Sequence, residues 1–433
     1  MSKNFKDDKN LPSSLIEFSV ENFGCFRDRT TFSMRTQRGA RNSFLVEKTD
    51  DMLLTTSIIY GANASGKSTL IQAIEFVKNK ILLSSSPDRT NKIAFSPFLL
   101  QKDCIEKPSY FEIIFSTNGV VYEYNFSISS DHTIVSENLI AVKKTTEEDI
   151  FIRKNNLFTN CKGEFDDSSL QKKTKDNALF LSVCNQWNNK EAEKIFTFFQ
   201  KNINFIDSHN TMGVSSFTQE MIRNSIDNKK SILEIIQKFD FAIEDFIEKE
   251  KVIPLSSLPI SVQEMFEKNH NISGNETVKE VSFHFTHKSF DSNNDNEGDI
   301  EIPMRNQSGG TKKLFEELGP IIDTLQHGKI LIFDELNTCF HPKILKAIVD
   351  LFHDKEANPH NAQLIFTTHE TSLLAYAKDE IDRDAFWFTE RDAYGRASLF
   401  SLSEFKERKD SANIDKKYLE GRYGAVPFIA YNL

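Results

Sequence analysis

The stretch Gly61-Ala62-Asn63-Ala64-Ser65-Gly66-Lys67-Ser68 matches the phosphate-binding pattern G-x-x-x-x-G-K-[ST] at every fixed position. Residues 55–60, directly before it, are apolar and β-branched and predict a buried strand. Residues 69–77, directly after it, place apolar side chains at helical spacing. A strand, a glycine turn and the start of a helix bring backbone N–H groups and the positive end of a helix to one point, which suits a polyphosphate. The stretch therefore predicts an α/β fold of the P-loop nucleoside triphosphatase class.

The residues of this loop are predicted to bind ATP and Mg²⁺. Lys67 would reach the β- and γ-phosphates of ATP, and the Ser68 hydroxyl would bind Mg²⁺. The other loop residues are expected to contact the nucleotide, largely through backbone N–H groups: Gly61, Asn63, Ala64, Ser65, Gly66 and Thr69. The alternative is a chance glycine-rich turn, which the flanking strand and helix patterns argue against.

Composition and charge narrow the class of protein. The chain has 433 residues, of which 39% are hydrophobic and 27% are charged, as in ordinary soluble proteins. The net charge of −10 argues against a protein that coats nucleic acid with its whole surface, and leaves room for a local basic groove. The five cysteines show no C-x-x-C pair and no metal-ligand spacing, which is typical of free thiols in a reducing cytosol. The N-terminus lacks an apolar signal core, and no apolar run is long enough to span a bilayer, so we expect a cytoplasmic protein without a membrane segment.

The sequence pattern predicts four regions along the chain. They are a disordered tail at 1–13, an N-terminal lobe with the loop and a β segment at 14–170, a helical insertion at 171–278, and a C-terminal lobe at 279–433. Strands are expected at 15–20, at 30–34, at 110–128 as a hairpin around Asn118-Gly119, and at 279–304, with a polar connection at 35–54 and helices over most of 177–250. The segment between the loop and residue 308 shows no sustained heptad pattern, so no long coiled coil is expected.

An acidic segment, Lys329-Ile330-Leu331-Ile332-Phe333-Asp334-Glu335, places four apolar residues before two carboxylates. Ligands of α/β sheets bind at the carboxyl ends of strands, which is where this pair would lie. Asp334 could then hold Mg²⁺, directly or through water, and Glu335 could orient or deprotonate the attacking water. A core strand that ends at an acidic turn is the alternative, and the presence of the phosphate loop favours the catalytic interpretation.

Two further segments carry candidate ligands for phosphate. Gly309 and Gly310 open an amphipathic helix that Ser308 can cap, so the start of this helix could accept an anion. A buried strand at 364–368 is followed by His369, whose side chain could hydrogen-bond a γ-phosphate oxygen. Gln101 follows a strand-like run and could contact Mg²⁺ and water, with a solvated loop residue as an equal alternative.

The order of these parts resembles the ABC-type ATPases, in which a Walker A loop, a signature helix, a Walker B strand, a D-loop and a switch histidine follow one another. The matching residues are Gly61–Ser68, Ser308–Thr311, Ile330–Glu335, Leu336–Pro342 and His369. Most of the chain is similar to the RloA/AbiL and AriA group of bacterial ATPases from two-gene abortive-infection systems. That resemblance rests on residues 22–23, 61–68, 97–100, 177–182, 308–314, 333–336, 383–388 and 418–427.

The resemblance implies an ABC-type fold with a mixed sheet, an inserted β segment and a short helical region. It also implies that Asn22 joins the nucleotide-binding residues, and that the signature helix of one subunit closes over ATP held by another, giving a dimer or higher assembly. The implied function is an ATP-hydrolysing sensor that controls a separate toxic effector, such as a Toprim-type nuclease encoded nearby, in response to a trigger such as a phage product. A DNA-engaged repair or restriction ATPase is the alternative, and contact with nucleic acid is left open.

Three features of the sequence limit the resemblance. Thr311 stands where transporters usually carry Gln, which argues against transport. Asn337 stands where the group usually carries Asp after Asp-Glu-Leu, which puts the rate of hydrolysis in question. Asp382 and Asp384 form a D-x-D pattern of the kind that Toprim nucleases use, but the stretch after His369 is too short for a Toprim domain. We therefore expect this pair to be the polar start of a strand.

Overall fold

The structure is a computed structural model of the chain. It describes residues 13–37, 39–46, 49–85, 95–143, 146–207, 212–239, 242–258, 260, 263, 276–336, 340–377, 379–406 and 413–427. The chain divides into two compact units. The first comprises Met1–Thr211 together with Asp323–Leu433, and the second comprises Met212–Ile322. The expected tail lies outside the described residues, except for Ser13.

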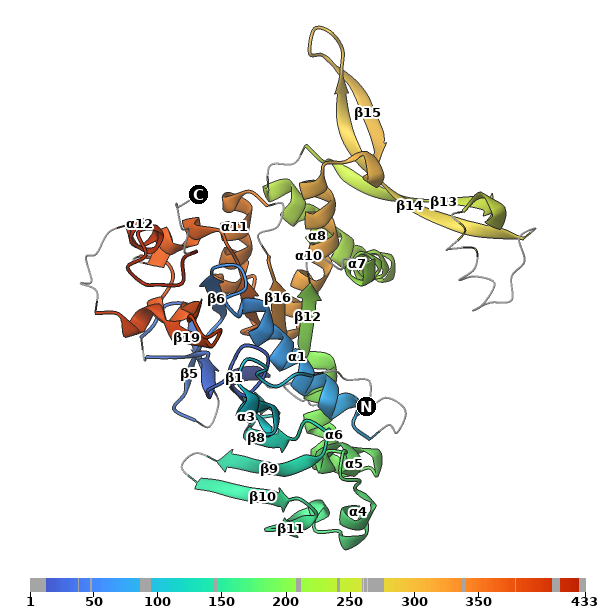
Figure 1. Ribbon diagram of the computed structural model, residues 1–433. Coiled ribbons are helices and arrows are strands. Elements are labelled where there is room, and N and C mark those ends of the chain that lie inside the picture. The colour runs from blue at the N-terminus through green and yellow to red at the C-terminus, as the bar shows by residue number, and fades with distance from the viewer. Residues whose placement is uncertain are drawn as a thin grey trace, which may run out of the picture. The chain divides into compact units, whose positions relative to one another are not determined.

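The first unit contains a six-stranded mixed sheet that carries the phosphate loop (Figure 1). Its strands, in spatial order, are β12 (Ile203–Asp207), β16 (Ile330–Asp334), β17 (Gln363–Thr367), β6 (Thr56–Gly61), β18 (Phe386–Arg391) and β19 (Ala397–Ser401). The first five are parallel, and β18 and β19 form an antiparallel hairpin. The apolar runs predicted as strands at 55–60, 330–333 and 364–368 are buried, as a parallel sheet with two covered faces requires.

Strand β12 lies within the segment 177–250, which the sequence pattern predicts to be mostly helical. It follows the helices α5 (Phe180–Gln186) and α6 (Lys190–Thr197). A short apolar run of five residues does not distinguish a buried strand from a helix. This run forms a strand because it pairs with β16 along its whole length. The second unit therefore begins at Met212 rather than at the expected boundary near 171.

A seven-stranded antiparallel sheet also belongs to the first unit. Its strands, in spatial order, are β11 (Leu157–Thr159), β10 (Thr146–Lys154), β9 (Ile134–Lys143), β8 (Val120–Ile128), β7 (Ser109–Thr117), β1 (Ser14–Glu21) and β2 (Thr30–Ser33). The predicted hairpin is confirmed, because β7 pairs with β8 around a turn in which Asn118 (φ 50°) and Gly119 (φ 71°) are left-handed. The predicted strands at 15–20 and 30–34 are confirmed as the antiparallel pair β1 and β2.

A third, small sheet corrects the expectation of a polar connection at 35–54. It consists of β3 (Arg35–Thr36), β5 (Met52–Leu54) and β4 (Ser43–Leu45). Strands of two or three residues are too short to show an alternating pattern in the sequence. Arg35 anchors this sheet, since its guanidinium pairs with Glu17 on β1 and with Asp51 (Nε–Oδ1 3.0 Å).

Helices cover the mixed sheet, with α1 (Lys67–Leu83) against β6 and β16 and α11 (Pro342–His353) against β6 and β17. The shorter helices of this unit include α3 (Lys102–Ile105), α4 (Ser168–Lys173) and α12 (Ile414–Leu419). Residues Arg383–Ala385 form a single helical turn before β18, and Asp384 Oδ2 accepts a hydrogen bond from Thr36 Oγ1 (2.7 Å). This contact agrees with a structural interpretation of the D-x-D pattern.

The C-terminal end of α1 is held by residues 177–182, one of the segments on which the resemblance rests. Lys80 Nζ donates a hydrogen bond to Asn177 O (3.0 Å), and burial lowers the pKa of Lys80 to about 8. Ser182 Oγ donates to Ile81 O (2.6 Å). The segment therefore fixes the far end of the helix that begins at the phosphate loop.

A buried ion pair supports that segment from the antiparallel sheet. Glu137 on β9 and Arg153 on β10 are both fully inaccessible to solvent, with Oε2 and Nη1 3.3 Å apart. Glu137 also accepts hydrogen bonds from Tyr124 Oη (2.8 Å) and from the backbone N–H groups of Phe180 (2.6 Å) and Leu181 (3.0 Å) at the start of α5. Both carboxylate oxygens thus have donors, which a buried charge requires.

The second unit combines helices with a three-stranded antiparallel sheet. Its elements are α7 (Met212–Asn224), α8 (Ile226–Lys238), β13 (Asp245–Pro254), β14 (Thr277–Phe290), β15 (Asn296–Pro303) and most of α10 (Gly309–His327). The strands predicted at 279–304 are confirmed as the twisted ribbon β14–β15 in Figure 1. Strand β13 starts inside the segment predicted to be helical. Half of its residues are exposed and the strand lacks the alternation of a half-buried strand, so its sequence does not indicate a strand.

Helix α10 contains a proline, and helix α7 compensates for it. Pro320 has no N–H to donate to Glu316 O, the carbonyl four residues earlier. Thr218 Oγ1 on α7 donates a hydrogen bond to Glu316 O instead. This approach requires Gly319, because a Cβ there would lie 2.3 Å from Thr218 Oγ1. On the same helix, Phe315 packs against three aromatic rings of the sheet, Phe246, Phe283 and Phe285.

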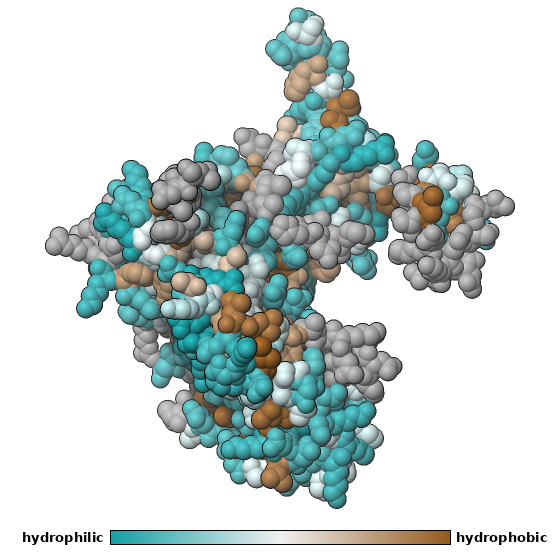
Figure 2. Space-filling model, in the orientation of Figure 1, coloured by the Kyte–Doolittle hydropathy of each residue, from teal (hydrophilic) through white to brown (hydrophobic). Residues whose placement is uncertain are grey.

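Hydrophilic side chains cover most of the face shown in Figure 2, and hydrophobic side chains form small separate patches. None of the helices in the described ranges is long and apolar enough to cross a membrane. The same ranges contain no long coiled coil, as the sequence predicts.

Candidate nucleotide-binding site

The phosphate loop joins β6 to α1, as the sequence predicts. Gly61 ends β6, and a Cβ there would lie 2.5 Å from the carbonyl oxygen of Thr389 on the neighbouring strand. Gly66 precedes α1 with φ 124°, and a Cβ there would lie 3.1 Å from Cys25 Sγ. The first position therefore needs glycine for close packing, and the second needs it for a backbone conformation that other residues rarely adopt.

A cavity of about 570 Å³ lies over the loop. Eight of the predicted site residues line it: Asn63, Ala64, Gly66, Lys67, Ser68, Thr69, Glu335 and His369. Three lining residues were not predicted: Gly24, Cys25 and Arg391. The cavity brings the loop together with residues that follow β16 and β17, far away in the sequence. Ligands of parallel α/β sheets bind at this end of the strands.

Lys67 is almost completely buried, with 5% of its surface exposed. Its Nζ donates hydrogen bonds to Gly61 O (2.8 Å) and Ala62 O (2.9 Å). Burial lowers the pKa of Lys67 to about 8, and the charges of Glu335 and Asp334 oppose this shift. A polyphosphate beside the ammonium group would add negative charge and favour the protonated form of Lys67.

The two carboxylates follow β16, where the sequence places them. Thr367, at the end of β17, orients both residues: its Oγ1 donates to Asp334 Oδ1 (2.6 Å) and accepts from Glu335 N (2.8 Å). Glu335 has a left-handed backbone (φ 61°), a conformation that costs a residue with a side chain roughly 1–2 kcal/mol. Glu335 lines the cavity, whereas Asp334 is not among the lining residues and acts on Lys67 through its charge. Thr367 is a positioning residue that the sequence pattern did not indicate.

His369 follows β17 and lies near Glu335, with His369 Nε2 and Glu335 Oε1 3.9 Å apart. Burial lowers the pKa of His369, and the charge of Lys67 lowers it further, while Glu335 and Asp334 act in the opposite direction. The imidazole is therefore mainly neutral at pH 7. One of its ring nitrogens could donate a hydrogen bond to a phosphate oxygen.

Ser65 and Asn22, two further predicted residues, do not line the cavity. Ser65 Oγ shares a hydrogen bond with Thr389 Oγ1 (2.5 Å), which fixes the loop to β18. Asn22 is buried, and its Nδ2 donates to Cys104 O (2.8 Å) while its Oδ1 accepts from Phe98 N (3.1 Å). Backbone groups of residues 98 and 104 therefore engage the Asn22 side-chain amide, and its implied contact with nucleotide stays a prediction.

Gln101 lies in a neighbouring cavity and does not line the one over the loop. Its Oε1 accepts a hydrogen bond from Arg27 Nη1 (3.2 Å), and its Nε2 donates weakly to Asp103 Oδ2 (3.4 Å). The assignment of Gln101 to Mg²⁺ stays a prediction.

The signature residues belong to the second unit. Ser308 caps α10, because its Oγ accepts a hydrogen bond from Thr311 N (3.1 Å), which confirms the expected cap. Gly309 and Gly310 form the first turn of α10, so their N–H groups belong to the positive end of that helix. Asn337 lies outside the described residues.

The residues of the loop cavity fit ATP with Mg²⁺. Gly66 and Lys67 line the cavity at the start of α1, and the Lys67 ammonium has two backbone carbonyls as partners. The Ser68 hydroxyl and the Asp334 carboxylate are oxygen ligands of the kind that Mg²⁺ shares with substrate phosphates. In the described ranges, no three His, Cys, Asp or Glu side chains gather into a metal site, and Mg²⁺ in P-loop proteins does not need such a cluster.

The lowered pKa of Lys67 predicts that ATP affinity depends on pH. In the chain without ATP, Lys67 loses its charge above about pH 8. Bound phosphates would keep Lys67 protonated to higher pH. ATP binding should therefore weaken above that pH, by at most about tenfold per pH unit, and should take up a proton. Calorimetry between about pH 7 and 9.5, in buffers of different ionisation enthalpy, measures both effects.

Lys67→Arg is the control for this pH dependence, because a guanidinium keeps its charge throughout this range. Whatever its absolute affinity, this variant should lose the decline above pH 8. A wild-type affinity that stays flat up to the highest pH would contradict the predicted role of Lys67.

Comparison with protein families gives one match that spans most of the chain. A family model described as "AAA domain, putative AbiEii toxin, Type IV TA system" matches residues 57–375. The matched range includes the phosphate loop, both carboxylates and His369. No curated protein matches the sequence.

Several solved structures of Smc head domains are similar to this chain. The SMC head domain from Thermotoga maritima is 12% identical, with a TM-score of 0.37 over 89% of this chain and 98% of that one. An Smc head bound to the C-winged helix domain of ScpA is 13% identical, with a TM-score of 0.39 over 89% and 97% of the two chains. An Smc head with an extended coiled coil, bound to the C-terminal domain of ScpA derived from Pyrococcus furiosus, is 11% identical, with a TM-score of 0.37 over 95% and 100%.

The fold is that of an ABC-type P-loop NTPase. The loop follows a central strand of a mixed sheet, the acidic pair follows a parallel strand of that sheet, and the histidine follows the strand between them. Since the family model covers well over half of its length, the chain belongs to this AAA-domain family, with an ABC-type ATPase fold.

Proposed function

We propose that the chain binds ATP with Mg²⁺ on the phosphate loop and hydrolyses it to ADP and phosphate. The observation that carries this proposal is one cavity lined by Lys67, Ser68, Glu335 and His369. Lys67 would hold the β- and γ-phosphates, while Ser68 and Asp334 would hold Mg²⁺. Glu335 would orient or deprotonate the attacking water, and His369 would hydrogen-bond the γ-phosphate. Bound Mg²⁺ would neutralise charge on the phosphates.

A complete ATP site would form between two copies of the chain. Each copy has two helix starts that suit an anion, one at α1 after Gly66 and one at α10 with its Ser308 cap. Two such starts from different copies could bracket one γ-phosphate. ATP binding would then stabilise a dimer or higher assembly.

Mixing two inactive variants tests this arrangement. Lys67→Ala should lose ATP binding, and Ser308→Arg should bind ATP but fail to hydrolyse it, because the arginine blocks the start of α10. Mixed together, the two variants should regain part of the wild-type ATPase rate, since one intact site can form from the two undamaged halves. Each variant alone is the control. A lack of complementation at every mixing ratio would argue against shared sites and leave ATP binding itself unaffected.

The proposed biological role is the control of a separate effector in antiviral defence. Its support is the similarity of segments such as 177–182 and 418–427 to ATPases of two-gene abortive-infection systems, together with a family description that names a toxin–antitoxin system. The effector would be a Toprim-type nuclease encoded nearby, and the trigger a phage product in the cytoplasm.

Expression together with the neighbouring gene tests the biological role. The pair should protect bacteria from some phage, and Lys67→Ala should abolish this protection. The chain alone should neither protect nor cut nucleic acid. Nuclease activity of the purified chain would contradict the proposal, and an ATPase rate that rises with DNA alone would favour the alternative of a DNA-engaged repair or restriction ATPase.

A further inference from the structure

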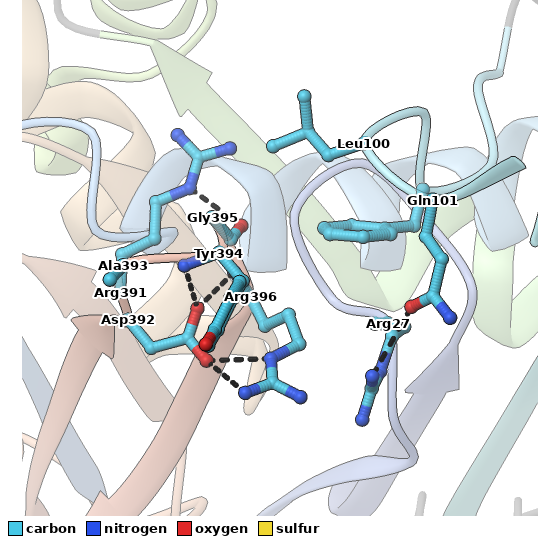
Figure 3. A pocket seen from close by; sticks show the side chains of 10 residues that line it. Arg27, Leu100, Gln101, Arg391, Asp392, Ala393, Tyr394, Gly395 and Arg396 are labelled. Atoms are coloured by element: carbon cyan, nitrogen blue, oxygen red, sulfur yellow. Dashed lines mark hydrogen bonds and ion pairs between the residues drawn. The ribbon is translucent and has the colours of Figure 1, made fainter.

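A second cavity, of about 850 Å³, lies beside the phosphate loop in the first unit (Figure 3). The β18–β19 hairpin, residues 391–396, forms one wall. Arg27, Phe98, Leu100 and Gln101 form the other. Figure 3 shows the hairpin facing Arg27 and Gln101 across the cavity.

The two cavities share a wall. Arg391 lines both of them, and its Nη1 lies 3.5 Å from the carbonyl oxygen of Ala64 in the phosphate loop. Ala397, the first residue of β19 after the turn, donates a backbone hydrogen bond to Cys25 O (2.8 Å), and Cys25 lines the loop cavity. The two cavities therefore meet at Arg391.

The hairpin presents an exposed aromatic ring on a rigid turn. Tyr394 is 74% exposed. Asp392 Oδ1 accepts hydrogen bonds from the backbone N–H groups of Tyr394 and Arg396, both at 2.9 Å. The Arg396 guanidinium is held by Asp392 Oδ2 (Nε–Oδ2 2.6 Å) and lies 5.0 Å from the centre of the Tyr394 ring.

The tip of this hairpin closely approaches the opposite wall. Gly395 has φ +78°, and a Cβ there would lie 2.3 Å from Leu100 Cδ1. Glycine therefore allows the tip to touch the opposite wall. Because Asp392 holds the turn, the backbone that carries Tyr394 is in place before a ligand binds.

We propose that this second cavity holds the nucleoside half of the nucleotide, with Tyr394 as the surface on which the base stacks and Arg391 beside the phosphates nearest the ribose. The inference rests on the proposed binding of nucleotide phosphates by the loop. When the loop holds the phosphates, the ribose and the base of the nucleotide need a binding site next to the loop. The adjoining cavity offers an aromatic face and cationic side chains. Stacking on an aromatic ring tolerates different bases, so the platform should serve ATP and GTP alike.

Binding of ATP and of inorganic tripolyphosphate to the full chain with Mg²⁺, measured by calorimetry, tests this inference. Tyr394→Ala should weaken ATP binding by about 5- to 150-fold, the range measured for loss of one base–aromatic stack, and should weaken GTP binding similarly. Tripolyphosphate has no base, so its affinity should not change. Tyr394→Phe keeps the ring and should bind ATP as the wild type does. Since Tyr394 is exposed, neither variant should lower the melting temperature.

Three results would overturn the inference while leaving phosphate binding by the loop intact. The first is unchanged ATP affinity in Tyr394→Ala. The second is an equal loss of affinity for ATP and tripolyphosphate, which would mean that the substitution disturbs the loop. The third is equal affinity of the wild type for the two ligands, because the nucleoside would then contribute nothing. A wild-type chain that binds neither ligand would overturn the proposed function and this inference together.

Discussion

Glu335→Gln should bind ATP with nearly unchanged affinity and hydrolyse it about 10²–10⁴ times more slowly, because an amide cannot accept the proton of the attacking water. The substitution keeps the size of the side chain. The left-handed backbone at this position and the hydrogen bond from its N–H to Thr367 Oγ1 do not involve the carboxylate, so the geometry should survive. The variant should accumulate as an ATP-bound assembly. Single-turnover phosphate release, combined with calorimetric binding, measures the two effects separately.

Glu370→Gln is the matched control for that experiment. Glu370 follows His369 in the loop after β17, and its Oε1 accepts a hydrogen bond from Ser372 N (2.9 Å), which a glutamine oxygen can also accept. Its turnover should stay close to the wild-type rate. If Glu335→Gln hydrolyses ATP as fast as the wild type, Glu335 is not the general base. Thr367 would then not position a catalytic residue through its contact with Glu335.

Arg153→Met should destabilise the first unit by about 3–5 kcal/mol, because it leaves the buried Glu137 carboxylate without its counter-ion. It also removes the donor to Ala178 O (2.7 Å) in the segment that holds the end of α1. The melting temperature should fall by on the order of 10 °C, as measured by circular dichroism or calorimetry. The loss should extend to ATP binding near the melting temperature, since α1 begins at the phosphate loop.

Lys162→Met is the control for the buried pair. Lys162 forms an exposed ion pair with Glu148 on β10 (3.2 Å), and exposed pairs contribute little to stability. Its melting temperature should barely change. The double variant Glu137→Leu with Arg153→Met should be less destabilised than the sum of the two single variants, because it removes both charges at once. Additive losses would show that the two side chains stabilise the unit independently.

The chemistry of the loop could be predicted from the sequence because its parts are local. Gly61, Gly66, Lys67 and Ser68 lie within eight residues, and the flanking apolar runs specify the strand and the helix around them. The same holds for the acidic pair at the end of an apolar run and for the hairpin turn at Asn118-Gly119, where the residue types match the backbone that the turn requires. Each of these features depends on residues that are neighbours in the chain.

Other elements could not be predicted, because they depend on partners far away in the sequence. Strand β12 is a strand through its pairing with β16, and the strands of the small sheet are too short to show a period. Glu137 and Arg153 are of residue types that usually lie on the surface, so the sequence alone suggests that they are exposed. Only the folded chain shows that both are buried and that each carboxylate oxygen of Glu137 has a hydrogen-bond donor.

The sequence by itself determined the class of the protein and the residues that would contact the phosphates, since phosphate binding depends on short motifs of neighbouring residues. The tertiary structure alone decided which other side chains surround them. It engaged Asn22 with backbone groups, brought Arg391 beside Ala64, and set the ring of Tyr394 across from Arg27. Arg391 and Tyr394 stand in no motif, and hydrogen bonding between strands hundreds of positions apart determines where they lie.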